Sequence, residues 1–341
     1  MNFLSSAPVD VDIGRAGRAD AYILQTLPPS SSVIPMFYVR TPLLPHPFLS
    51  TPERRIWLKL ENLQPSGSFK MRGLGALCQD AQARGKTRIV APSGGNAGYS
   101  AALAARALGM AAEVVVPTTT PEATRALIAR TGATVTVHGD VWEESNQYAL
   151  GLCDAAHVEY APAFDHPVIW QGNSTLIDEI VADLPQMDAI VASVGGGGLL
   201  AGVLTGLARH GRLDCRVVAC ETEGAASFRA ALDAGRPVRL DAITSVAKSL
   251  GALEVARWPL DAIRRFPHAS VVLPDSAALM GVVRFADDLR QLVEPACGVA
   301  LATAYLDHPS LAGARDVVVV VCGGVSVSAQ QLVAWRQAAA D

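Results

Sequence analysis

One lysine stands in a setting that could make it a nucleophile. Lys70 lies in the segment PSGSFKMRG, between Phe69 and Met71. Apolar neighbours that exclude water lower the pKa of a lysine amine, and the neutral amine can then attack a carbonyl carbon. The alternative interpretation is a turn that leads into a helix, with Ser68 as the helix N-cap. The loops elsewhere in the chain decide between the two.

A run of four glycines follows the apolar segment DAIVASV. It comprises Gly195, Gly196, Gly197 and Gly198, and Leu199 then opens an apolar stretch with helical spacing. Glycines let the backbone approach a charged group, and the free N–H groups at the start of a helix attract an anion. This pattern favours a phosphate site, although neither the GK[ST] of a Walker loop nor a GxGxxG spacing is present. A tight turn with close packing is the alternative.

A second loop, SGGNAG, also joins an expected strand to an expected helix. Its backbone N–H groups could bind a carboxylate, and the Asn96 side chain adds a donor and an acceptor. The residues expected to contact such a carboxylate are Ser93, Gly94, Gly95, Asn96 and Ala97. A turn in which Ser93 or Asn96 caps the helix is the alternative.

A third feature is Cys322, at the end of the apolar run DVVVVVC. Buried cysteines are usually inert, but the glycines that follow would place this sulfur at the carboxyl edge of a sheet. Ligands of open parallel sheets bind at that edge. A reactive lysine, a phosphate site and a carboxylate site together suit pyridoxal phosphate as cofactor and an amino acid as substrate.

The elements that must position these residues alternate regularly between strand and helix. Short apolar strands alternating with helices predict parallel sheets covered by helices. Strands are expected at residues 55–61, 87–92, 111–117, 133–139, 188–194, 215–221 and 316–322, and helices at 71–85, 99–109, 121–132, 174–184, 199–211, 225–234 and 327–340.

The chain length of 341 residues exceeds one ordinary core. We therefore expect an α/β fold with two lobes, each an open, mostly parallel sheet with helices on both faces, and the cofactor in the cleft between them. The boundaries expected are residues 37–63 with 167–341 for a large cofactor-binding domain and 64–166 for a small domain. Residues 1–36 are rich in Pro and Ser and are expected to be an extension with little fold of its own.

The composition excludes several classes of protein. Hydrophobic residues make up 50% and charged residues 18%, which is typical of globular enzymes. The net charge of −4 offers no basic surface for nucleic acid, and no apolar run reaches the length of a membrane span. Six scattered cysteines without a CxxC pair argue against a zinc site and a disulfide framework, which favours a reducing, cytoplasmic location.

Six motifs in order resemble those of the pyridoxal-phosphate enzymes of fold type II, the tryptophan synthase β group, and within it the L-serine/L-threonine dehydratases. They are PSGSFKMRG, SGGNAG, VGGGGLL, ITSVAKSLGA, VEPACG and VCGG, and the resemblance as a whole runs from about Thr41 to Gln331. The resemblance implies that Lys70 forms a Schiff base with the cofactor and Phe69 packs on its ring. It also implies that Asn96 binds the ring hydroxyl, Cys322 faces the pyridine nitrogen, and the glycine run through Leu199 holds the phosphate.

The family also implies an activity: β-elimination of L-serine, and of L-threonine, to pyruvate or 2-oxobutyrate and ammonia by a homodimer. Serine racemase, threonine synthase and a non-catalytic module that binds an amino acid or pyridoxal phosphate are the alternatives. Glu294 and Cys297 of VEPACG either support the site or pack the core.

Some family members hold a monovalent cation, K⁺, beside the phosphate. The matching ligands are the Glu221 side chain and the carbonyls of Gly195, Ala225, Leu250 and Ala252.

The sequence departs from its relatives at Gly94, where they carry Ala or Ser. The chain also ends about one helix after Cys322, so we expect no regulatory domain like that of the allosteric threonine deaminases.

Overall fold

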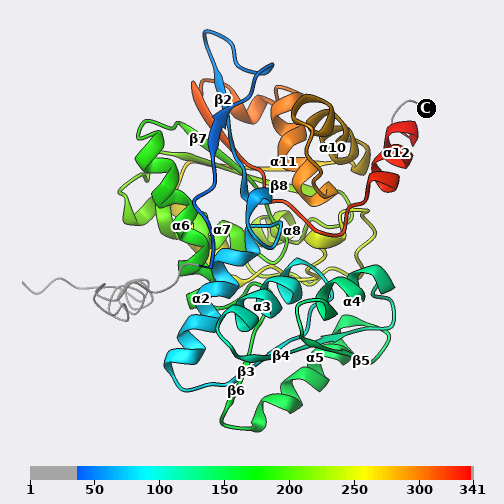
Figure 1. Ribbon diagram of the computed structural model, residues 1–341. Coiled ribbons are helices and arrows are strands. Elements are labelled where there is room, and N and C mark those ends of the chain that lie inside the picture. The colour runs from blue at the N-terminus through cyan, green and yellow to red at the C-terminus, as the bar shows by residue number, and fades with distance from the viewer. Residues whose placement is uncertain (1–36, 339–341) are drawn as a thin grey trace, which may run out of the picture. The chain divides into compact units, whose positions relative to one another are not determined.

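The computed structural model describes residues 37–338, so the predicted extension at residues 1–36 lies outside the described part. Two separate sheets organise these residues, and helices flank both (Figure 1). The expected α/β architecture with two mostly parallel sheets is confirmed.

The larger sheet has six strands in the order β1-β2-β10-β7-β8-β9. All neighbours in it are parallel except β1 and β2. Its strands are β1 (Leu43–Pro45), β2 (Arg55–Lys59), β7 (Ala189–Ser193), β8 (Arg216–Thr222), β9 (His268–Leu273) and β10 (Asp316–Val320).

The smaller sheet has four strands, all parallel, in the order β5-β4-β3-β6. Its strands are β3 (Arg88–Ala91), β4 (Ala111–Val116), β5 (Thr134–Val137) and β6 (Val158–Tyr160).

Helices connect these strands as crossover units must. The α-helices are α2 (Lys70–Ala83), α3 (Asn96–Ala107), α4 (Glu122–Ala129), α5 (Trp142–Gly151), α6 (Pro167–Asp183), α7 (Gly198–Arg209), α8 (Ser227–Ala234), α9 (Arg257–Ala262), α10 (Asp275–Leu289), α11 (Pro295–Tyr305) and α12 (Ala329–Ala338). Short 3₁₀ turns lie at η1 (Glu61–Leu63), η2 (Leu152–Asp154), η3 (Lys248–Leu250), η4 (Ile263–Arg265) and η5 (Pro309–Leu311).

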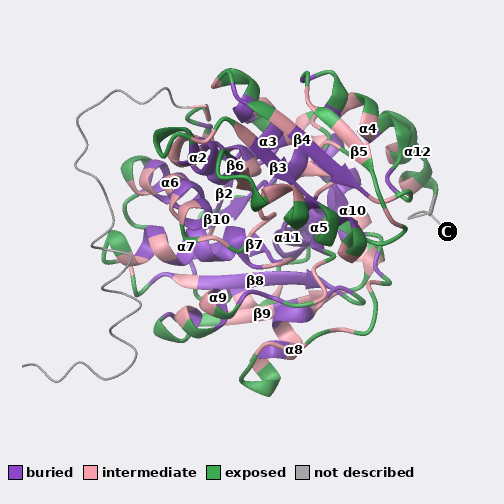
Figure 2. Cartoon of the chain, turned by 90° about the horizontal axis from the view of Figure 1, so that it is seen from below, coloured by how far each residue is buried: buried purple, intermediate pink, exposed green. Residues whose placement is uncertain are grey.

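The centre of the larger sheet is formed by β7 and β10, which pair in parallel with Val318 opposite Ile190. Every residue of both strands is buried, because helices cover both faces of a central parallel strand. Figure 2 shows this buried interior surrounded by exposed helix faces such as those of α4 and α12. Two strand ends that carry predicted site residues are therefore fixed in the core.

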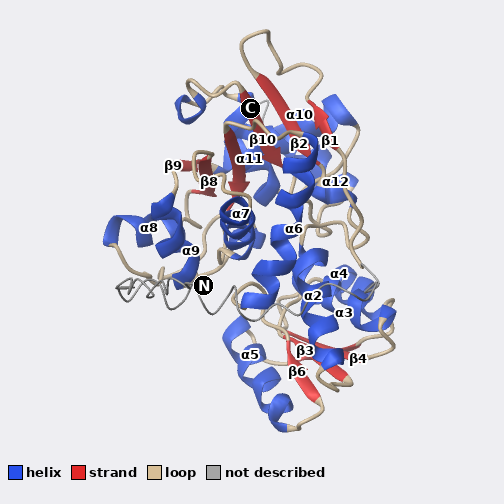
Figure 3. Cartoon of the chain, turned by 90° about the vertical axis from the view of Figure 1, so that its left-hand side faces the viewer, coloured by secondary structure: helices blue, strands red, loops and turns tan. Residues whose placement is uncertain are grey.

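The chain crosses between the two sheets twice. It leaves the larger sheet after β2 and enters the smaller one through α2, then returns after β6 through α6. These two helices pack against each other, and they lie between the sheets in Figures 1 and 3. The predicted division into residues 37–63 with 167–341 and 64–166 stays a prediction.

One helix begins earlier than predicted. The sequence indicated a start at residue 174, whereas α6 begins at Pro167, which occupies its first turn, and the His166 side chain accepts a hydrogen bond from the Val168 N–H. A proline in the first turn and a capping side chain are start signals that the irregular apolar pattern concealed. The elements α5, β6, β9, α9, α10 and α11 were not predicted at all.

Within residues 37–338, no helix combines the length and the apolar character needed to cross a membrane.

Candidate active site

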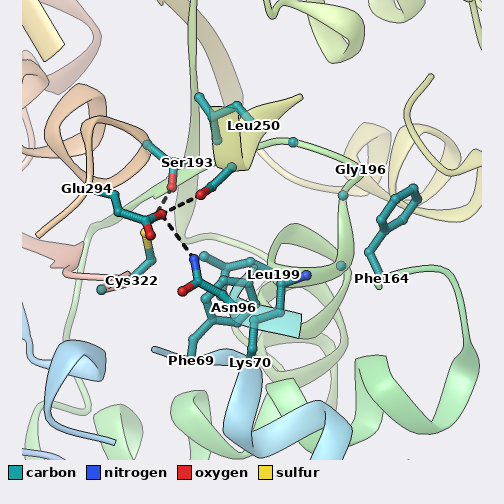
Figure 4. Close-up of a pocket in the computed structure, with 16 residues that line it drawn as sticks. Phe69, Lys70, Asn96, Phe164, Ser193, Gly196, Leu199, Leu250, Glu294 and Cys322 are labelled. Carbon is teal, nitrogen blue, oxygen red and sulfur yellow. Dashed lines mark hydrogen bonds between the residues drawn. The ribbon is translucent and has the colours of Figure 1, made fainter. Parts of the chain in front are cut away.

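A pocket opens beyond the carboxyl ends of β7 and β10, as expected for parallel strands. All nine residues predicted to bind the cofactor line it, and Figure 4 shows the labelled ones grouped around the pocket. The lining residues are Phe69, Lys70, Asn96, Phe164, Ser193, Gly195, Gly196, Gly197, Gly198, Leu199, Ser249, Leu250, Glu294, Ala296, Cys322 and Gly323.

Lys70 is the first residue of α2, so the helix start places its side chain in the pocket. Its Nζ donates a hydrogen bond to the Ala163 carbonyl at 2.5 Å and lies 5.2 Å from the centre of the Phe69 ring. Loss of water around the amine lowers the pKa of Lys70 to about 8, and the nearby Cys322 opposes that shift. A substantial fraction of Lys70 is therefore neutral near pH 8, as a nucleophile or a base requires.

Ser68 is not the N-cap of this helix. Phe69 occupies the capping position, and no side chain makes a capping hydrogen bond there. Ser68 is instead buried at 1% exposure, and its Oγ has no hydrogen-bond partner. Ser68 is not among the residues that line the pocket, so its unpaired hydroxyl is a local cost of burial beside Phe69.

The glycine run leads directly into the twelve-residue helix α7, with Gly197 as its N-cap at φ +93°. A Cβ added at Gly196 would lie 2.3 Å from Cε1 of Phe164, and one added at Gly195 would lie 3.0 Å from Cα of Leu250. Glycine is therefore required at these positions by space and, at Gly197, by backbone conformation. The free N–H groups at the start of α7 suit a phosphate group.

Asn96 opens α3 and points into the pocket (Figure 4). The N-cap of α3 is Gly95, and no side chain caps this helix, so the alternative of Ser93 or Asn96 as a cap is wrong. Instead the Asn96 Nδ2 donates to Glu294 Oε2 at 3.0 Å, and its Oδ1 accepts from the Val325 N–H at 3.0 Å.

The other residues predicted to act in the SGGNAG loop do not line the pocket. Ser93, Gly94, Gly95 and Ala97 are absent from the lining. A Cβ added at Gly94 would lie 2.6 Å from Oγ1 of Thr120, so the threonine occupies the space that a larger side chain would need.

Cys322 does reach the pocket. It is 6% exposed, and its Sγ lies 3.4 Å from the Ser193 hydroxyl at the end of the neighbouring strand. Its carbonyl accepts a hydrogen bond from the Phe69 N–H at 3.1 Å, which joins the strand end to the lysine loop. Burial and contact with this thiol raise the pKa of Cys297 well above its ordinary value, so Cys297 is a neutral packing group.

The cation site matched to five residues stays a prediction, and two of the five line the cofactor pocket. Gly195 and Leu250 line the pocket, whereas Glu221, Ala225 and Ala252 do not. Both carboxylate oxygens of Glu221 accept backbone N–H groups at 2.8 Å at the start of α8, and burial raises its pKa to about 7. Among residues 37–338, no group of three or more His, Cys, Asp and Glu side chains could hold a metal ion.

Five lining residues were not predicted as site residues: Phe164, Ser193, Ser249, Ala296 and Gly323. Phe164 comes from the irregular segment that returns from the smaller sheet, and Ser249 comes from η3. Ser193 ends β7 immediately before the glycine run, so its position at a strand end was a usable signal. The motif ITSVAKSLGA, which contains Ser249, was a second one.

A buried cluster of four charges fixes the helix that carries Lys70. Arg72, two residues further on, donates to Glu61 at 2.7 and 2.8 Å and to Glu179 of α6 at 2.8 Å. Lys59 of β2 also donates to Glu179, at 2.5 Å. Two positive and two negative groups thus neutralise one another in the core, which offsets the cost of burying each.

Comparison with known proteins agrees with this geometry. Residues 34–323 match the family model described as "Pyridoxal-phosphate dependent enzyme". The chain belongs to the pyridoxal-phosphate dependent enzymes. The glycine run at the start of α7 and the lowered pKa of Lys70 fit that cofactor.

Individual relatives show which members of this enzyme family the chain resembles. The chain is 44% identical over 313 residues to a human protein named "Serine dehydratase-like", covering 88% of this chain and 94% of the relative. It is 44% identical over 291 residues to a Bos taurus "L-serine dehydratase/L-threonine deaminase", covering 82% and 89%. The fungal L-serine ammonia-lyase from Rhizomucor miehei shares 38% identity and a TM-score of 0.83, over 88% of this chain and 98% of that one.

Proposed function

We propose that the chain catalyses the pyridoxal-phosphate-dependent β-elimination of L-serine, and of L-threonine, to pyruvate or 2-oxobutyrate and ammonia. The observation that carries this proposal is Lys70, whose pKa is lowered to about 8 in the same pocket as a glycine-lined helix start. The names of relatives at 37–46% identity support this choice of substrates.

Different residues would bind different parts of the cofactor and the substrate. The N–H groups of Gly195 to Gly198 and Leu199 would hold the cofactor phosphate, Phe69 would pack on its ring, and Asn96 would bind its ring hydroxyl. The Ser93 to Ala97 loop would receive the substrate carboxylate through backbone N–H groups. When bound, the cofactor supplies a covalent link for the amino group and an electron sink for the bond broken at Cα.

Lys70 would act as the general base for the Cα proton. The neutral amine accepts the Cα proton of the amino acid, because a base is most effective when its pKa lies near the working pH. The carbonyl of Ala163, 2.5 Å from Nζ, holds the amine beside the pocket through a hydrogen bond. Phe69 and Phe164 exclude water from this region.

Cys322 would face the pyridine nitrogen with its thiol group. A thiol cannot stabilise a positive charge on that nitrogen as a carboxylate would, which disfavours long-lived carbanions and favours prompt loss of the β-hydroxyl. An acidic replacement, Cys322→Asp, is expected to shift products toward D-serine. Unchanged product ratios and chirality would reject this role.

The direct test is pyruvate release from L-serine in a coupled assay, with a D-serine assay in parallel for racemisation. Lys70→Ala should abolish both the turnover and the visible absorbance of bound cofactor, while Lys86→Ala, at a lysine outside the pocket, should retain both. A purified Lys70→Ala variant that keeps the visible band would refute the assignment of Lys70. Cofactor binding without turnover of either amino acid would favour a non-catalytic module.

Three further expectations belong to the same proposal: a K⁺ ion near Glu221, a homodimer and a cytoplasmic location. The family resemblance supports the first two, and the unpaired cysteines support the third. Assays in K⁺ against a bulky organic cation, and sedimentation of the purified chain, test the first two directly.

A further inference from the structure

Glu294 lies at the N-cap of α11, yet its side chain makes no capping hydrogen bond to that helix. It is 3% exposed and lines the pocket beside Cys322 (Figure 4). Among the lining residues, Lys70 and Glu294 are the two with basic or acidic side chains. A buried carboxylate that does not cap its own helix needs other partners.

Those partners are all donors. Oε2 accepts from Asn96 Nδ2 at 3.0 Å and from the Ser249 hydroxyl, and Oε1 accepts from the Ser326 N–H at 2.9 Å and from the Ser326 hydroxyl. Four donors match the acceptor capacity of an ionised carboxylate. Glu294 thereby joins residues from α3, η3 and the segment after β10 around one side of the pocket.

The hydrogen bond between Glu294 and Asn96 fixes the orientation of the Asn96 side-chain amide. Glu294 can only accept, and the Val325 N–H, 3.0 Å from Asn96 Oδ1, can only donate. A flipped amide would place its NH₂ against the Val325 N–H and its oxygen against the carboxylate, so both hydrogen bonds would be lost. One of the two Nδ2 hydrogens remains free for a ligand.

The chain after Cys322 is shaped around this carboxylate. A Cβ added at Gly324, where φ is +137°, would lie 2.1 Å from Cδ of Glu294. The glycine therefore lets the backbone pass over the carboxyl group and bring the Ser326 N–H to it.

We propose that Glu294 is a positioning residue that fixes the Asn96 amide so that its free N–H faces the ring hydroxyl of the cofactor. This inference rests on the proposed function, because it takes the bound group to be pyridoxal phosphate. Glu294 acts through Asn96 and not on the substrate.

The test is a double-mutant cycle read by cofactor binding to the apo-protein. Glu294→Gln keeps the shape but replaces one acceptor with a donor, and it should weaken pyridoxal phosphate binding by about tenfold, as expected for a lost hydrogen bond to a charged group. It should also shift the absorption maximum of the bound cofactor, which reports hydrogen bonding at the ring hydroxyl. In an Asn96→Ala background the same change should have no further effect on affinity. Glu53→Gln, at an exposed residue on the β1–β2 connection, is the matched control.

The outcomes separate the two proposals. Failure of the wild-type chain to bind pyridoxal phosphate would refute the proposed function and this inference together. Normal wild-type binding with unchanged affinity and spectrum in Glu294→Gln, or additive losses in the double variant, would refute the inference alone. If Glu294→Gln is not recovered folded, Glu294→Asp gives the same test, because shortening the side chain withdraws the carboxylate from Asn96 while keeping its charge.

Discussion

Gly196 offers a sharp test of the phosphate site, because a single methyl group has no room there. A Cβ at this position would lie 2.3 Å from Cε1 of Phe164, which is 1.1 Å short of the 3.4 Å at which ordinary contact begins. Either the ring or the glycine loop must move by about that distance. Forcing an extra methyl group into a packed site typically costs about 1–3 kcal/mol, so Gly196→Ala should weaken cofactor binding by about 5- to 150-fold.

The assay is titration of the apo-protein with pyridoxal phosphate, followed by its visible absorbance. Gly151→Ala is the control, since an added Cβ there meets nothing within 4 Å. A second variant, Gly196→Ala with Phe164→Ala, removes the ring and should recover part of the lost affinity. A dissociation constant for Gly196→Ala within about twofold of wild type would refute the reasoning, because a shift of the loop by about 1 Å disrupts several hydrogen bonds to a phosphate together.

Three other changes have defined outcomes. Arg72→Met leaves two buried carboxylates without their guanidinium and should lower the free energy of unfolding in urea by about 3–5 kcal/mol, whereas Arg257→Met, at an exposed pair, should cost less than about 1 kcal/mol. In the apo-protein, the rate at which Lys70 reacts with pyridoxal should rise with pH, with a midpoint near pH 8. Burial lowers the pKa of Lys70, so the neutral amine forms at a lower pH than in a free lysine, and a midpoint near pH 10 would contradict this reasoning. Gly94→Ala should lower the melting temperature, because the new methyl group would clash with Thr120. Adding Thr120→Ser to this variant should restore part of the lost melting temperature, because it removes the Cγ2 atom that would lie 2.7 Å from the new methyl group.

Most of the pocket residues that the sequence predicted lie shortly after the carboxyl end of an apolar strand, where parallel sheets bind ligands. Asn96 follows β3 of the smaller sheet, and the glycine run and Cys322 follow β7 and β10 of the larger one, whereas Lys70 follows β2 only after the 3₁₀ turn η1. The alternation of strands and helices was readable for a related reason. An unbroken run of β-branched residues, such as that of β10, is typical of a central parallel strand that is buried on both faces.

The parts that were missed lack a local signal. Every residue of α11 is buried, so it has no polar face and no helical period to detect. The three-residue strand β6 is too short to show alternation. Phe164 comes from an irregular segment, and the packing of the two sheets brings it to the pocket. The role of Glu294 was left open between support and packing for the same reason, because its partners are distant in sequence.

The two places where the chain crosses between the sheets have a mechanical consequence. Lys70 stands at the outward crossing and Ala163 near the return crossing, and their hydrogen bond joins the two connections. The ion pairs between Arg72 of α2, two residues after Lys70, and Glu179 of α6 join the same two connections. Any rotation of one sheet against the other would have to break or strain these contacts. The position of the reactive amine is thus tied to the packing of α2 against α6.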